Sequence, residues 1–146
     1  MDFLKLKDAD FRDKEIIKSL NKFIGDNLRA IIAEKGMKQV EVAADIGLQE
    51  GSFKTILGGG HAIDTTKYIA FMVLYGINPL EIMLGKDYIK ILAMFPERDR
   101  KGREIISQED YVLGLLDEAL IETKKMDPDT QERILSKMAT KIVIAK

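Results

Sequence analysis

Cysteine is absent from this chain of 146 residues, which also contains only three prolines and one histidine. The absence of cysteine excludes disulfide bridges, thiolate metal sites and cysteine nucleophiles. No apolar run approaches the roughly 20 residues that a bilayer-spanning helix needs. Residues 1–5 include charged side chains, Asp2 and Lys5, and lack the apolar centre of a signal peptide. These absences predict a cytoplasmic protein that makes no use of a membrane.

An excess of charge of one sign is also missing. The formal net charge is −1, and basic and acidic side chains balance along the whole length of the chain. A protein that holds nucleic acid through a general basic field normally carries a clear positive excess. Any binding to nucleic acid must therefore come from the local placement of a few groups.

Strand patterns are nearly absent, whereas apolar residues recur at helical spacing throughout the chain. Gly36, Gly47 and the glycine run at residues 58–60 are placed to end three helices. Asp64 and Ser107 are placed as N-caps. Pro79 occupies the first position of a further short helix, where its missing N–H costs little. The sequence therefore predicts an all-α fold, and the stripe Tyr68, Phe71, Met72 and Tyr75 is expected in its core.

These helix-ending and helix-starting residues divide the chain into four parts. We expect an N-terminal helical extension (1–18), a five-helix domain (19–85), a short helix with a charged linker (86–106) and a helical hairpin (107–146). A hairpin of about 40 residues rarely folds without a partner surface. It packs either on the first domain or on another chain, and we favour a homodimer in which two hairpins form one four-helix core. The residues expected at this interface are Tyr111, Leu115, Leu116, Leu120, Ile134, Leu135, Met138 and Ile142.

Residues 39–56 meet the steric demands of a helix-turn-helix motif. With Gln39 as the first position, a small residue (Ala43) stands fifth, where two helices approach closely, and glycine (Gly47) stands ninth, where the turn requires positive φ. The remaining contact positions are apolar: Val42, Ile46, Leu48, Phe53 and Ile56.

On these positions the chain resembles the lambda-repressor-like (Cro/repressor, or XRE) helix-turn-helix family. The resemblance covers about residues 22–84, including Ile24-Gly25-Asp26-Asn27-Leu28-Arg29 and the segment from Ile77 to Met83. It implies a five-helix lambda-repressor-like bundle, of bacterial or phage origin, that binds double-stranded operator DNA as a dimer. The function implied is that of a transcriptional regulator, most often a repressor.

The same resemblance places the third helix of the bundle in the major groove and the start of the second helix against a phosphate. The glycine-rich loop at residues 58–62 is expected to be loose and to offer amide donors to the sugar–phosphate backbone. The residues expected at the DNA are Lys38, Gln39, Gln49, Glu50, Gly51, Ser52, Lys54, Thr55, His61 and Lys67.

A second hypothesis is a protein-interaction module, antitoxin-like, an anti-repressor or a phage accessory protein, which keeps the bundle without reading DNA. It is motivated by the Glu50-Gly51 pair, since a carboxylate repels phosphates, and by the small net charge. We expect no enzyme, because no nucleophile–base pair or phosphate-cradling loop stands out. We also expect no cofactor and no metal, and His61 is interpreted as a loop residue or a phosphate contact.

Overall fold

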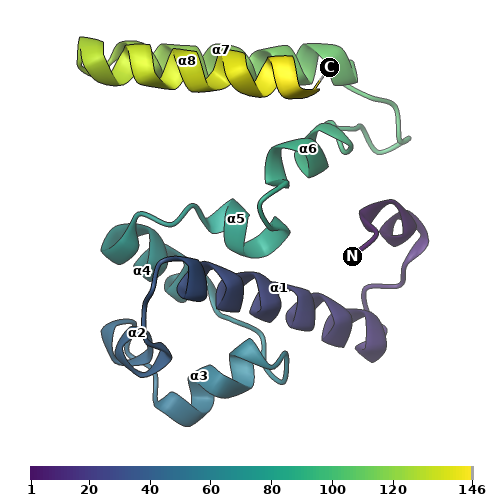
Figure 1. The fold of residues 1–146 in the computed structure, drawn as a ribbon. Helices are drawn as coiled ribbons and strands as arrows, with labels where there is room; N and C mark the ends of the chain where they lie inside the picture. The colour runs from purple at the N-terminus through teal and green to yellow at the C-terminus, as the bar shows by residue number, and fades with distance from the viewer. Residues whose placement is uncertain (146) are drawn as a thin grey trace. The chain divides into compact units, whose positions relative to one another are not determined.

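The computed structural model describes the backbone of residues 1–145 and the side chains of residues 1–141. Residues 1–145 form one 3-10 helix and eight α-helices, which confirms the all-α prediction. In chain order these are η1 (Phe3–Asp8), α1 (Lys14–Glu34), α2 (Gln39–Asp45), α3 (Glu50–Leu57), α4 (Thr65–Tyr75), α5 (Pro79–Leu84), α6 (Tyr88–Ala93), α7 (Gln108–Lys124) and α8 (Pro128–Ala145) (Figure 1). Within this part of the chain, every helix falls short of the length and apolarity that a bilayer crossing requires.

The chain divides into two compact units, unit 1 (Met1–Ile91) and unit 2 (Leu92–Lys146). The division falls inside the segment 86–106, where the sequence places a short helix and a linker. Helix α1 runs unbroken through residues 18 and 19, the expected end of the N-terminal extension, because no glycine or proline interrupts it before Gly25. The extension instead contributes η1, whose Phe3 ring meets the Phe23 ring of α1 edge-on at 5.4 Å.

Unit 1 has a continuous apolar core to which α1 to α5 all contribute. Leu28 and Phe71 are fully buried, and the ring centroids of Phe53 and Phe71 lie 6.5 Å apart. Two members of the stripe expected in the core, Tyr68 and Tyr75, are half-buried. Met72 is 47% exposed, so its expected core position is wrong. Helix α4 is apolar on several sides, and periodicity alone does not show which side faces inward.

The predicted helix caps are present. Asp64 accepts from the backbone N–H groups of Thr66 and Lys67 at the start of α4, and Ser107 Oγ accepts from Asp110 N at 3.1 Å at the start of α7. Pro79 opens α5 in its first turn, as expected. These local bonds fix where the helices begin, and so they fix the spacing of the apolar faces that follow.

Unit 2 consists mainly of α7 and α8, which lie side by side (Figure 1). The Gln131 side-chain amide donates to the Lys124 and Met126 carbonyls and so closes the turn between the two helices. The stretch before α7 is an ordered turn, because Asp99 accepts from the backbone and side chain of Arg103. The same hydrogen bonds lower the pKa of the Asp99 carboxyl.

Candidate functional site

Helices α2 and α3 are joined by a tight turn at residues 46–49. Gly47 has φ of +76°, the left-handed conformation that the sequence predicts at this position. Ala43 is 1% exposed, and Leu48 N donates to its carbonyl at 2.8 Å. Val42, Ile46, Phe53 and Ile56 are buried, and Leu48 packs against the same core. The positive φ predicted for Gly47 is therefore confirmed, and the other six positions all contribute to the apolar core.

Helix α3 is anchored to the bundle along one side. Phe53, Ile56 and Leu57 are buried, and the C-terminal end of α3 crosses α1 at Gly25. The approach is so close that a Cβ on Gly25 would lie 2.5 Å from the Leu57 carbonyl oxygen. Arg29 of α1 donates from Nη2 to the same carbonyl at 3.2 Å. The opposite side of α3 is therefore held in a fixed orientation.

That opposite side carries five of the ten residues expected at the DNA. Glu50, Gly51, Ser52 and Lys54 are exposed, and Thr55 is half-buried. Lys54 Nζ pairs with Glu50 Oε1 at 2.8 Å, so the lysine charge of this helix is balanced within the helix itself. The Thr55 hydroxyl donates to the Gly51 carbonyl at 2.9 Å, and the space beside Gly51 is open. We call Glu50, Gly51, Ser52, Lys54 and Thr55 the α3 edge.

The residues preceding α2 and α3 make no capping bond. Lys38 and Gln49 both have extended backbone at the N-cap position, and neither side chain accepts from its helix. Lys38 is instead paired loosely with Glu41, with 3.8 Å between Nζ and Oε1. Gln39 is half-buried at the start of α2.

Two further candidates lie in the α3–α4 connection and in the helix that follows it. His61 is exposed in the loop. Lys67 is half-buried in the first turn of α4, where Nζ donates to the Ile46 carbonyl at 2.9 Å. This lysine therefore caps the C-terminal end of α2 through its ammonium group.

The glycine run at residues 58–60 differs from the loose loop expected. Gly59 is buried at φ +82°, and a Cβ there would lie 2.7 Å from the Lys22 Cα. The amides of Gly58, Gly59 and Gly60 donate to the carbonyls of residues 54, 56 and 55. These three N–H groups are therefore already used, and glycine serves here for close packing instead of for flexibility.

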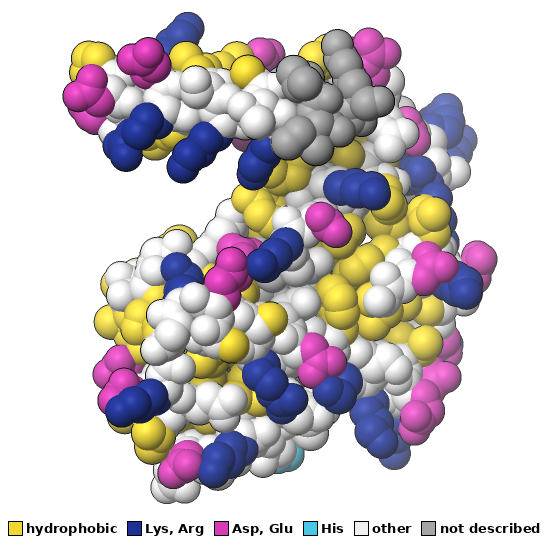
Figure 2. Space-filling view, in the orientation of Figure 1, with side chains coloured by type: hydrophobic (Ala, Val, Ile, Leu, Met, Phe, Trp, Pro, Cys, Tyr) yellow, Lys and Arg dark blue, Asp and Glu magenta, His cyan; other side chains and the backbone are white. Residues whose placement is uncertain are grey.

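The surface of unit 1 carries mixed charge. On the face shown in Figure 2, Lys and Arg side chains are interspersed with Asp and Glu. Among the described residues, no group of three or more His, Asp or Glu side chains is placed to hold a metal ion.

The first half of α1 lies beside the glycine run and was missed by the sequence reasoning. Lys14, Lys18 and Lys22 recur every fourth residue on one face of the helix, which is the signal that could have found them. Only the tertiary structure brings Lys18 and Lys22 next to Gly58, Gly59 and Gly60.

The residues expected at a dimer interface are distributed over α7 and α8. Tyr111, Leu115, Ile134 and Met138 are half-buried. Leu116, Leu120 and Leu135 are exposed, at 40%, 37% and 45%. The side chain of Ile142 lies outside the described residues.

No protein-family model matches this chain, and comparisons with curated proteins and with solved structures give no match either.

Proposed function

We propose that this chain is a cytoplasmic, sequence-specific DNA-binding transcriptional regulator of the lambda-repressor-like type, a repressor that acts as a dimer. The single observation that supports this most is the α3 edge. A helix held by three buried side chains presents its other side to solvent, next to a glycine turn at positive φ. A rigidly held helix of this kind fits the major groove, which is about 12 Å wide.

The chemistry of the edge sets what each residue contributes. Ser52 and Thr55 bring hydroxyl groups that exchange hydrogen bonds with base edges. Lys54 supplies a phosphate contact once its ion pair with Glu50 opens, and Glu50 then accepts from a cytosine amino group. Gly51 leaves room for a base edge or a sugar to approach the helix backbone closely.

The hairpin supports the dimeric part of the proposal. Within the described residues of unit 2, only Pro96 and Thr123 are buried. Two helices cannot enclose a core alone, whereas four helices from two chains can. A symmetric dimer also presents two α3 edges, which reach successive major grooves when they lie about 34 Å apart.

A gel-shift titration at low salt with the DNA upstream of this protein's own gene tests the proposal. We expect the wild type to bind and Lys54→Ala and Thr55→Ala to weaken binding by about tenfold each, the loss expected for one good contact. Lys90→Ala, in α6, is the matched lysine control and retains full affinity. Glu50→Gln frees Lys54 and strengthens binding to any duplex. Absence of wild-type binding, or indifference to Lys54→Ala and Thr55→Ala, contradicts the proposal.

A second candidate function is a protein-interaction module of the antitoxin or anti-repressor kind. Two observations favour it: the Glu50–Lys54 pair neutralises the α3 edge, and α4 exposes Ile69, Met72 and Val73 on one face. Contiguous exposed apolar side chains are typical of protein–protein contacts. This candidate requires that no salt-dependent retention on DNA occurs and that a partner protein is released by Val73→Glu. A steep fall of DNA affinity with salt excludes it.

A further inference from the structure

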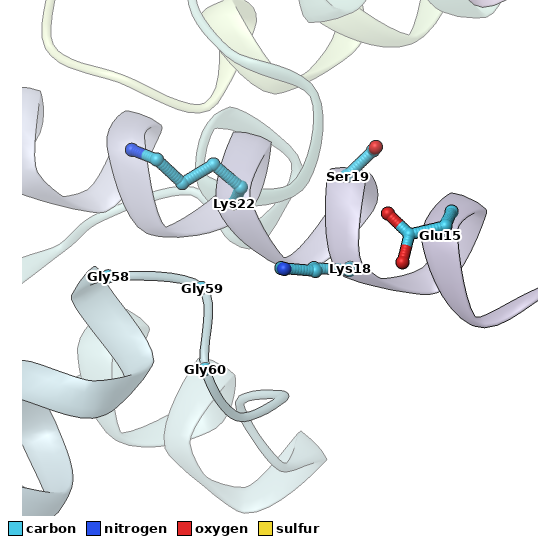
Figure 3. A pocket seen from close by; sticks show the side chains of 7 residues that line it. All are labelled: Glu15, Lys18, Ser19, Lys22, Gly58, Gly59 and Gly60. Atoms are coloured by element: carbon cyan, nitrogen blue, oxygen red, sulfur yellow. The ribbon is translucent and has the colours of Figure 1, made fainter.

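A groove of about 530 Å³ opens between the first half of α1 and the glycine run that follows α3 (Figure 3). Its α1 wall carries Glu15, Lys18, Ser19 and Lys22, and its other wall is residues 58–60. A second hollow of about 300 Å³ lies against Gly59 and Gly60 and is lined by Lys14 and Lys18. Lys18 is thus the charged side chain common to both hollows.

The groove is closed at one end, where its two walls touch. Gly59 meets the backbone of Lys22 so closely that a Cβ would lie 2.7 Å from Cα and 2.9 Å from N. From this contact α1 continues past the bundle toward Lys14, where its exposed side chains outnumber its half-buried ones. One end of the groove is therefore fixed by the direct packing of the glycine run on α1.

Lys18 is the cation available to a ligand in this groove. In Figure 3 its side chain extends toward the glycine run, whereas Lys22 extends away along α1. Lys22 pairs with Asp26 at 2.5 Å, and within the described residues Lys18 and Lys14 form no ion pair. Glu15 is the one acidic side chain among the residues that line the groove.

The spacing of the lysines along α1 lowers the stability of this helix when no anion is bound. Like charges four residues apart on a helix repel each other, and here Lys14, Lys18 and Lys22 form two such pairs in succession. An anion bound beside Lys18 would relieve part of that repulsion. The glycine wall contributes space, since its amides already donate to carbonyls of α3.

The groove adjoins the α3 edge. A Cβ on Gly60 would lie 2.8 Å from Thr55 Cγ2, so the glycine wall packs directly on a residue of that edge. We propose that the groove binds a backbone phosphate of the duplex whose bases face α3, with Lys18 as the residue that neutralises it. This inference rests on the proposed function, and it adds a phosphate site on α1 to the surface formed by α2, α3 and the loop.

The test is the salt dependence of duplex affinity for Lys18→Ala, Lys18→Arg and the control Lys90→Ala. Removal of one phosphate contact lowers the slope of log affinity against log salt by about one and weakens all sequences alike. We expect this for Lys18→Ala, with base preference unchanged, while Lys18→Arg retains the wild-type slope. Because Lys18 is exposed, the circular dichroism spectra of the variants should match the wild type.

The outcomes separate this inference from the proposed function. If Lys54→Ala weakens binding and Lys18→Ala leaves affinity and slope unchanged, the groove is not a duplex contact and only this inference fails. If the wild type does not bind DNA, both fail. Inorganic phosphate, titrated while the amide resonances of residues 15–22 and 58–60 are followed, identifies the source of the anion. A shift there that depends on Lys18, with an unchanged duplex slope, assigns the groove to free phosphate and overturns the inference.

Discussion

The Tyr75 phenol links two helices through one hydrogen bond. Its hydroxyl donates to Asp45 Oδ2 at 2.5 Å and so ties α4 to the end of α2. Burial of the ring and the bond to Asp45 raise the pKa of Tyr75 to about 12. The protonated phenol is therefore favoured in the folded state, and its ionisation opposes folding.

This link predicts a specific loss of stability at alkaline pH. A tyrosine with a pKa raised above its unfolded value of about 10 stabilises the fold fully below that pH. The contribution disappears as pH rises toward about 12. We expect urea unfolding between about pH 8 and about pH 11 to show a smaller decline in stability for Tyr75→Phe than for the wild type. Asp45→Asn should also reduce the decline, and an unchanged decline in both variants would contradict the link.

Helices α1 and α3 cross at a glycine, and this contact orients the α3 edge. Gly25 lies in the middle of α1, where glycine is ordinarily unfavourable, yet the Leu57 carbonyl leaves no room for any larger residue. Gly51 also lies inside a helix, and no atom lies within 4 Å of the Cβ that would be added there. Close packing therefore requires glycine at position 25, whereas no packing contact requires it at position 51.

These two positions form a matched pair of glycine-to-alanine substitutions. Gly25→Ala forces α1 and α3 apart, and we expect a loss of about 1–3 kcal/mol, the range for overpacking. Gly51→Ala has no clash and gains helix propensity, so we expect a gain of about 0.5–1 kcal/mol. Thermal or urea unfolding of the two variants measures both values. Equal effects at the two sites would show that the α1–α3 crossing is not as close as described.

The two units differ in how well each encloses a core. Unit 1 buries thirteen apolar side chains. In unit 2 the apolar residues of α7 and α8 remain half-buried or exposed over the described range. We propose that a second copy of the hairpin covers these apolar residues, because a symmetric dimer packs the same surface of each chain against its partner.

Charged substitutions among the apolar residues of α7 should therefore change the oligomeric state. We expect the double variant Leu116→Glu, Leu120→Glu to sediment as a monomer under conditions in which the wild type is a dimer, because charge burial in a helical core is strongly unfavourable. Ile121→Glu, on the opposite side of α7 and 55% exposed, is the matched control and should remain dimeric. A wild type that is monomeric at all accessible concentrations contradicts this prediction.

Much of the helical framework could be predicted from local sequence. The glycine at positive φ in the α2–α3 turn, the capping bonds of Asp64 and Ser107, and Pro79 at the start of α5 were all predicted. Each depends on interactions within a few residues, so neighbouring residues determine it. The burial of Phe53 and Ile56 in α3 was predicted in the same way, from their apolar positions in the motif.

Tertiary packing decided what local sequence could not. The exposure of Met72 depends on which side of an almost wholly apolar helix meets the core. The ordered glycine run and the groove beside Lys18 depend on an approach between residues 22 and 59, which are distant in sequence. Spacing along one helix determines which residues share a face, but only packing between helices determines what that face meets.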